Sequence, residues 1–182
     1  MKIILIGNIG AGKTTIAQKI LEQYKEAEFV SIDVIRKKHG DGTTEKENYC
    51  KDKFIEAIDL KTKFQIIELT GVGVLGERLF ELLSNYKQPI LVFYLIASLE
   101  DLLNRAKEKI WDTPFPIGKD NISTAIGYTE DRYNEGLADN LTAKCANAIL
   151  VSLLNNNETM MKENLKIIFS KIESYRNSKN DV

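Results

Sequence analysis

The sequence predicts an α/β fold in which a five-stranded parallel sheet carries helices on both faces. Five short apolar runs alternate with segments of helical periodicity, as expected when crossover helices join parallel strands. A glycine-rich loop directly follows the first run, and a helical pattern begins after it. At 182 residues the chain has the size of one compact domain, so we expect a single domain spanning residues 1–182.

The composition is that of a globular protein without a strong charge bias. Apolar residues make up 43% of the chain, and 25 Lys and Arg face 26 Asp and Glu, for a net charge of -1. We therefore expect no membrane association and no extended nucleic-acid surface. Cys50 and Cys145 are too few and too far apart for a disulfide framework, which fits a reducing compartment. The N-terminal apolar run is too short for a signal peptide or a membrane span, so we expect a cytoplasmic protein.

The first apolar run, Ile3 to Ile6, leads directly into a phosphate-binding loop of the pattern G-x-x-x-x-G-K-T. The expected nucleotide-binding residues are Gly7, Asn8, Ile9, Gly10, Ala11, Gly12, Lys13, Thr14 and Thr15. The glycines let successive backbone N–H groups turn toward a polyphosphate, and the following helix adds its positive end. Lys13 is expected to reach the β- and γ-phosphates of ATP, and the Thr14 hydroxyl to ligate Mg²⁺. A glycine-rich turn without a ligand is the alternative.

The first helix is expected from Lys13 to about Tyr24, and the second strand from Phe29 to Ile32. A strand, helix and strand in this order form a right-handed crossover in a parallel sheet. Asp33 and Arg36 follow at the carboxyl end of the second strand, where open α/β sheets bind their ligands. The alternative is that Asp33 caps a helix and that Arg36 is its salt-bridge partner.

Residues 34–61 are expected to form a small helical insertion over the sheet. Thr44 and Glu47 have the spacing of a capping box at the start of a helix. The predicted stripe of this helix consists of Cys50, Phe54, Ala57, Ile58 and Lys61.

The third strand is expected from Phe64 to Leu69. Beside a phosphate loop, Glu68 could hold a water of the Mg²⁺ shell or orient a substrate group, or it could simply pair with a lysine. Gly71 and Gly73 indicate either a close approach of the backbone to a ligand or a tight turn into the next helix.

The fourth strand, Ile90 to Ile96, is apolar throughout and is expected at the centre of the sheet. Ser98 and Asp101 predict the start of the next helix, which carries Arg105 and Lys109 on one side. From Trp111 to about Asn121 the prolines and glycine exclude a regular element, and a polar helix with Arg132 follows. The fifth strand is expected at residues 148–151 and the last helix around residues 161–172.

On these residues the whole chain resembles the small P-loop kinases, a group that includes adenylate kinase, shikimate kinase and the kinase domain of phage polynucleotide kinase. The most specific matches are the phosphate loop, the block from Asp33 to Arg36, and Arg105. The resemblance implies a three-layer fold with strand order 2-3-1-4-5. It also implies Mg²⁺ as the metal that accompanies ATP.

The resemblance further implies roles for individual residues. Asp33 would act as general base and Arg36 would hold an anionic group of the acceptor, with residues 34–61 as the acceptor-binding insertion. Arg105 and Arg132 would close on the transferred phosphate from a lid formed by residues 111–137. Together with Lys13 these are the expected catalytic residues, and Glu68 and Gly71 complete the expected substrate site.

The chain departs from its relatives at two places. No arginine follows Gly71 until Arg78, whereas adenylate kinase has one soon after the third strand, which argues against AMP as acceptor. Lys109 stands where many relatives have a second lid arginine, and a lysine keeps the charge without the bidentate fork.

Two functions follow from these observations. The first is a kinase that transfers the γ-phosphoryl group of Mg-ATP to a hydroxyl or phosphate of a small molecule or nucleotide. The second is a nucleotide-binding ATPase or switch that acts through a protein partner. The insertion and the lid favour the kinase, because a transferase must exclude water from the γ-phosphate.

Overall fold

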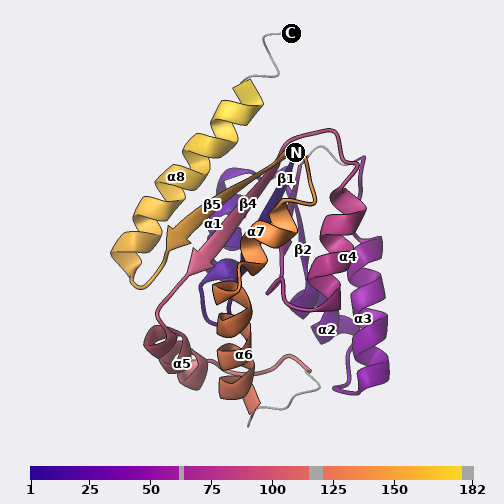
Figure 1. Cartoon of the computed structure of the whole chain (residues 1–182), viewed down its shortest axis with the longest axis vertical. Helices are drawn as coiled ribbons and strands as arrows, with labels where there is room; N and C mark the ends of the chain where they lie inside the picture. Colours follow the sequence, from indigo (N-terminus) through magenta and orange to yellow (C-terminus); the bar gives the residue numbers. More distant parts are fainter. Residues whose placement is uncertain (62–63, 115–120, 178–182) are drawn as a thin grey trace.

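The computed structural model describes residues 1–61, 64–114 and 121–177 (Figure 1). Its sheet contains five parallel strands in the order β2-β3-β1-β4-β5. The strands are β1 (Lys2–Gly7), β2 (Glu28–Ser31), β3 (Gln65–Glu68), β4 (Ile90–Ile96) and β5 (Ala148–Leu154). The predicted fold class, strand order and strand direction are confirmed. Every residue of β1 is buried, because β3 and β4 flank it and helices cover both of its faces.

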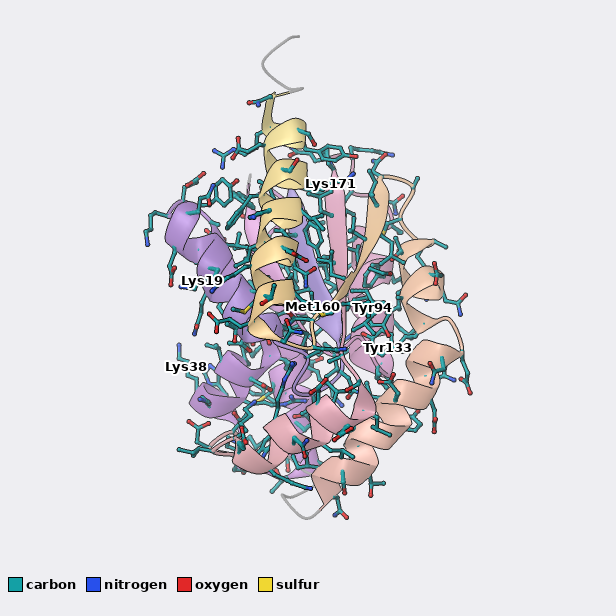
Figure 2. All side chains as sticks on the ribbon, turned by 90° about the vertical axis from the view of Figure 1, so that its left-hand side faces the viewer. Lys19, Lys38, Tyr94, Tyr133, Met160 and Lys171 are labelled. Carbon is teal, nitrogen blue, oxygen red and sulfur yellow. The ribbon has the colours of Figure 1, made fainter. Side chains whose placement is uncertain are left out.

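One face of the sheet packs against α1 (Lys13–Gln23) and α8 (Glu158–Asn177). Ile3 and Leu5 of β1 point to this side, where they join Ile16 of α1 and Ile168 of α8 in one apolar cluster. Figure 2 shows α8 lying lengthwise across this face of the sheet.

The opposite face packs against α3 (Thr44–Glu56), α4 (Val74–Leu83) and α7 (Leu137–Thr142). Ile4 and Ile6 of β1 point to this second cluster, because side chains alternate between the faces of a strand. The sheet therefore lies between two helical layers, and the carboxyl ends of β1, β2 and β3 meet at one edge.

The insertion after β2 is helical, as predicted, but its boundaries differ from the sequence prediction. α2 (Ile32–His39) begins at Ile32, the residue predicted to end the strand, so β2 ends one residue earlier than predicted, at Ser31. α3 is capped by Thr43, whose hydroxyl accepts a hydrogen bond from the Lys46 backbone at 3.2 Å. The predicted capping box of Thr44 and Glu47 is therefore wrong by one residue.

The predicted stripe of α3 is also too long. The helix ends at Glu56, so Ala57, Ile58 and Lys61 lie beyond it. Ile58 is nevertheless buried in the same apolar cluster as Cys50 and Phe54. Hydrophobic spacing persists past the end of the helix because the following loop packs onto the same core.

The segment predicted as a lid, residues 111–137, contains two different parts. Residues 115–120 lie outside the described residues, and α5 (Leu99–Glu108) and α6 (Ile122–Asn134) flank the loop. Within α6, Ile126 is fully buried and the Tyr133 ring stacks on Tyr94 with centroids 4.3 Å apart (Figure 2). The helical part of the segment thus belongs to the packed core.

None of the helices in the described ranges combines the length and the apolar composition that a membrane span requires.

Candidate active site

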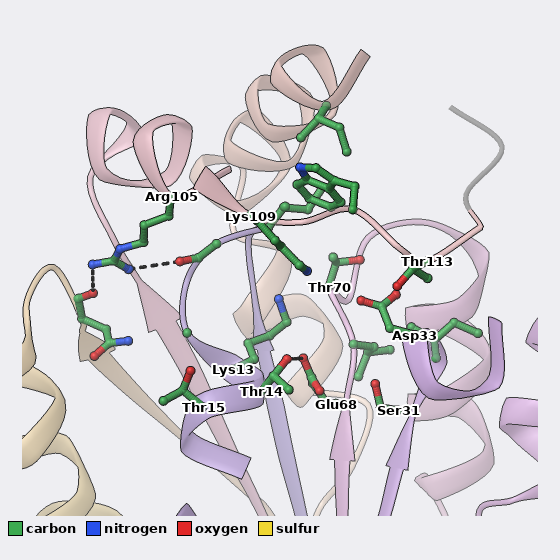
Figure 3. A pocket seen from close by; sticks show the side chains of 18 of the residues that line it. Lys13, Thr14, Thr15, Ser31, Asp33, Glu68, Thr70, Arg105, Lys109 and Thr113 are labelled. Atoms are coloured by element: carbon green, nitrogen blue, oxygen red, sulfur yellow. Dashed lines mark hydrogen bonds between the residues drawn. The ribbon is translucent and has the colours of Figure 1, made fainter. Parts of the chain in front are cut away.

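A cavity of about 710 Å³ opens at the carboxyl edge of the sheet (Figure 3). The phosphate loop forms its floor, the ends of β2 and β3 form one wall, and α5 with the loop between β5 and α8 forms the other. Its polar lining includes Lys13, Thr14, Ser31, Asp33, Arg36, Glu68, Thr70, Arg105, Lys109, Thr113 and Asn155. The predicted loop and the block after the second strand therefore face one continuous space.

The phosphate loop is held in shape by a residue far away in the sequence. Gly12 has a φ of +90°, and a Cβ atom there would lie 2.5 Å from the Asn155 amide nitrogen, so only glycine fits. Asn155 is buried and donates a hydrogen bond to the Ala11 carbonyl at 2.8 Å. The loop backbone is thus fixed before any ligand binds.

Lys13 is folded onto the loop that it follows. Its Nζ donates to the carbonyls of Gly7 at 3.0 Å and Asn8 at 2.9 Å, and the side chain is buried at the cavity floor. Burial lowers the pKa of Lys13 below its usual value, although the carboxylates of Glu68 and Asp33 act in the opposite direction. A phosphate group above the loop would add to the negative charge that these carboxylates place near the ammonium.

Thr14 and Glu68 meet at the base of the cavity. The Thr14 hydroxyl donates to Glu68 Oε1 at 2.7 Å, while Glu68 Oε2 is buried and has no hydrogen-bond partner among the described residues. An unpaired buried carboxylate oxygen beside a threonine hydroxyl fits a site for a hydrated divalent cation. The described residues contain no cluster of three or more His, Cys, Asp or Glu that could hold a metal alone. A cation at this position would therefore need further ligands from a bound nucleotide.

Asp33 and Arg36 lie on one face of α2 and are paired with each other. Arg36 Nη1 donates to Asp33 Oδ1 at 2.9 Å, and the Asp33 side chain, which lines the cavity, is 44% exposed. Asp33 lies in the first turn of α2 after the cap position, which Ser31 occupies. The salt bridge of the alternative interpretation is present, whereas the cap is not.

Glu47 of α3 holds the other side of Arg36. Arg36 Nε and Nη2 donate to the two Glu47 carboxylate oxygens at 2.8 and 2.5 Å. Both side chains are largely buried, with exposed fractions of 13% for Arg36 and 9% for Glu47. The spacing of Glu47 in the sequence indicated a helix cap and not this contact, because the two residues belong to different helices.

Arg105 lines the cavity but is engaged with backbone carbonyls. Its guanidinium donates to Gly10 at 3.0 Å and to Asn155 and Asn156 at 2.9 and 2.6 Å (Figure 3). In this arrangement Arg105 ties the phosphate loop to the loop after β5.

Lys109 and Trp111 lie above the phosphate loop. The Lys109 ammonium is 4.6 Å from the centroid of the Trp111 ring, whose Nε1 donates to the Ala106 carbonyl at 2.9 Å. Figure 3 shows the Lys109 ammonium pointing toward Lys13, and its charge contributes to the lowered pKa of Lys13. Lys109 therefore adds a second ammonium group to the cavity lining beside Lys13.

Two residues predicted for catalysis or substrate binding, Arg132 and Gly71, lie elsewhere. Arg132 does not line the cavity, and its guanidinium pairs with Glu135 at the end of α6. Gly71 is likewise absent from the lining. Its φ is +83°, and a Cβ atom there would lie 3.1 Å from the Tyr133 hydroxyl, so the glycine serves a tight turn against α6.

Asn8 connects the phosphate loop to α6. Its amide nitrogen donates to the Ile126 carbonyl at 2.9 Å and to Glu130 Oε2 at 3.0 Å. Its amide oxygen accepts from the Ile9 backbone at 2.8 Å. The loop thus has a second fixed support on the side opposite to Asn155.

Several lining residues were not predicted from the sequence, among them Ser31, Thr70, Thr113 and Asn155. The carboxyl end of the fifth strand was a usable signal for Asn155, because ligands of open α/β sheets bind at that edge. The three hydroxyl residues carry no motif that would single them out.

Comparison with solved structures shows that the chain has the fold of the small P-loop kinases. Shikimate kinase from Acinetobacter baumannii in complex with shikimate shares 18% identity, with a TM-score of 0.64 over 95% of this chain and 93% of that one. Deoxyadenosine kinase from M. mycoides with bound dATP shares 18% identity, with a TM-score of 0.54 over 95% and 100%. Chaetomium thermophilum Kti12 in complex with ADP-AlF3 shares 14%, with a TM-score of 0.59 over 93% and 98%. No protein-family model and no curated protein sequence matches the chain.

Proposed function

We propose that this protein is a kinase that transfers the γ-phosphoryl group of Mg-ATP to a small-molecule or nucleotide acceptor. The observation that carries the proposal is the shared cavity, which is lined by both the phosphate loop and Asp33. A cavity of this kind can hold a donor and an acceptor side by side.

The donor half would bind ATP through the loop amides, Lys13 and Thr14. Thr14 would hold the Mg²⁺ that accompanies ATP, and this ion would supply neutralisation of the charge that develops during transfer. Glu68 Oε2, buried without a partner among the described residues, suits a hydrogen bond to a water of that ion. Lys109 can leave the Trp111 ring and approach the γ-phosphate from above.

The acceptor half would place a hydroxyl or phosphate oxygen against Asp33. In transfer to a hydroxyl, a bond forms between the acceptor oxygen and the γ-phosphorus, and the bond from that phosphorus to the β-γ bridging oxygen breaks. ADP is the leaving group, and the hydroxyl proton passes to the Asp33 carboxylate and then to solvent. Asp33 is suited to this because its carboxylate is partly exposed to the cavity while Arg36 fixes its orientation.

The test measures ATP consumption with purified protein and Mg²⁺ against a panel of nucleosides, nucleotides and sugar-like alcohols. We expect at least one acceptor to raise turnover well above the hydrolysis measured in water alone, and Lys13→Ala to abolish that increase. ATP hydrolysis that no acceptor stimulates would favour the alternative function, a nucleotide-binding ATPase or switch that acts through a protein partner.

A further inference from the structure

The charge of the acceptor can be inferred from the way in which Arg36 is held. An arginine binds phosphate or carboxylate groups best when one edge of its guanidinium is available for two parallel hydrogen bonds. In this protein the edge formed by Nε and Nη2 is filled by the Glu47 carboxylate at 2.8 and 2.5 Å. Nη1 donates to Asp33 at 2.9 Å.

Releasing Arg36 for a substrate would be costly. Glu47 has an exposed side-chain fraction of only 9%, and its next cation, Lys51, lies 3.7 Å from Oε1 and is partly solvent-exposed. If Arg36 left this pair, the buried Glu47 carboxylate would keep only the more distant Lys51 as a counter-charge. Such a poorly paired buried charge is strongly destabilising. The ion pair between α2 and α3 is therefore a fixed part of the wall.

The other charges on this side of the cavity are also unfavourable to an anion. Asp33 and Glu68 both line it, and Glu68 Oε2 is buried. Lys13 and Lys109 point to the space above the phosphate loop, where the phosphates of ATP would use them (Figure 3). An acceptor phosphate beside Asp33 would therefore be repelled by these carboxylates more than it would be attracted by the lysines near the phosphate loop.

Hydroxyl side chains, by contrast, are present in the cavity lining around Asp33. Ser31, Thr70 and Thr113 line the cavity around Asp33, and Figure 3 shows Thr70 and Thr113 on either side of its carboxylate. Each hydroxyl can donate and accept, and a carboxylate accepts from an alcohol. This lining suits a compound with several hydroxyl groups.

We propose that the acceptor is an uncharged polyhydroxyl compound, such as a nucleoside or a sugar alcohol, because Glu47 already occupies the guanidinium that could bind an anionic one. This inference rests on the proposed kinase function and replaces the anion-binding role that the sequence predicts for Arg36. Arg36 becomes a positioning residue, which holds Asp33 toward the acceptor without touching it.

Two measurements test the inference. The first follows the Arg36 Nε–H resonance by NMR in protein labelled with ¹⁵N-arginine and saturated with Mg²⁺ and a non-hydrolysable ATP analogue, during titration with inorganic phosphate. We expect no saturable shift in the wild type and a saturable shift in Glu47→Gln, in which the guanidinium loses its charged partner. Lys51→Gln is the matched control, because it removes a neighbouring charge but leaves Arg36 paired, and should behave like the wild type.

The second measurement compares ATP turnover with matched acceptor pairs, each a hydroxyl compound and its phosphate monoester. We expect the uncharged member to be preferred by about tenfold or more in kcat/KM, and Glu47→Gln to reduce that preference. If Glu47→Gln does not fold, as judged by circular dichroism, Glu47→Asp is used instead, because its shorter side chain loosens the two hydrogen bonds to Arg36, and we expect the same changes at a smaller size.

A saturable phosphate shift of Arg36 in the wild type, or a preference for the phosphate monoester, would overturn the inference. The NMR titration tests whether Arg36 can bind an anion even when no acceptor raises ATP turnover. A failure of every acceptor to raise ATP turnover would count against the proposed kinase function alone.

Discussion

At the scale of single residues, Lys13 carries a charge in a place that disfavours it. Its ammonium is buried and donates to the backbone carbonyls of Gly7 and Asn8, and desolvation lowers its pKa. We expect Lys13→Ala to reduce nucleotide turnover on the order of 100-fold or more, because it removes a preorganised positive charge from the phosphate site.

The same substitution should leave the melting temperature nearly unchanged or slightly raised, since the lost contacts are offset by relief of the desolvation cost. Turnover and thermal melting are measured together. Lys19→Ala is the matched control, because Lys19 lies on the same helix and forms an exposed pair with Glu22 at 2.8 Å. Wild-type turnover in a folded Lys13→Ala protein would contradict the assignment of the loop.

For Asp33, a purely structural role and a catalytic role predict different effects of mutation. As an ion-pair partner that is 44% exposed, it should contribute less than about 1 kcal/mol to the free energy of unfolding. As the base for the attacking hydroxyl, its loss should lower kcat by about 100-fold or more. We therefore expect Asp33→Asn to be nearly as stable as the wild type but severely slowed.

The control for this prediction is Asp112→Asn. Asp112 forms an exposed ion pair with Lys37 at 2.8 Å and does not line the cavity. We expect that variant to keep full activity. If Asp33→Asn transfers phosphate as fast as Asp112→Asn, Asp33 has no part in the chemistry.

At the scale of elements, the segment between α5 and α6 is where ligand binding should change the dynamics. Lys109, Trp111 and Thr113 line the cavity, whereas Ile126 and Tyr133 of α6 are buried in the core. Hydrogen exchange at residues 109–114 should slow by about tenfold or more when Mg²⁺ and an ATP analogue bind. Exchange in the second half of α6 should stay unchanged.

Exchange is measured by mass spectrometry in the presence and absence of the analogue. Equal protection of both segments by the ligand would support the longer lid, residues 111–137, predicted from sequence. No protection in either would show that the loop does not respond to the nucleotide.

The elements that sequence predicted well are those whose signal is local. The phosphate loop and β1 could be recognised because the glycines, Lys13, Thr14 and the preceding aliphatic run are consecutive residues. The five strands were located by their apolar runs, but several element ends were misplaced, among them those of β2, α3 and β5.

The contacts that sequence did not predict join residues far apart along the chain. Arg36 and Glu47 belong to different helices, and Asn155 supports a loop that lies 144 residues earlier. Nothing in the neighbourhood of Glu47 distinguishes a helix-capping glutamate from one that turns toward another helix. The partner becomes known only when the angle between α2 and α3 is known.

At the scale of the whole molecule, the stability of the fold should depend on pH through Lys2. Lys2 is fully buried at the edge of the sheet opposite to the cavity, where Nζ donates to Asp59 O and Gln65 Oε1. Burial lowers the pKa of Lys2 from 10.5 to about 8, against the attraction of Asp59 and Glu28. The folded state therefore binds fewer protons than the unfolded state between these two values.

Because the unfolded state binds more protons in that window, the free energy of unfolding should rise with pH from about 8 toward 10. We expect an increase on the order of 1 kcal/mol between pH 7.5 and 9.5 in the wild type, which Lys2→Met should lack. Urea unfolding at both pH values measures the difference. A parallel pH dependence in the two proteins would exclude Lys2 as its source.

The contact between Lys109 and Trp111 should make the intrinsic tryptophan fluorescence sensitive to nucleotide binding. Trp111 is the only tryptophan in the sequence, and it lines the cavity with an ammonium group 4.6 Å from its ring. A cation over an indole shifts its emission, so departure of Lys109 toward a bound phosphate should change the intrinsic fluorescence. Titration with Mg-ATP should yield a saturable signal without any label, and Lys109→Met should lose most of it. A full signal in that variant would mean that the nucleotide reaches the indole directly.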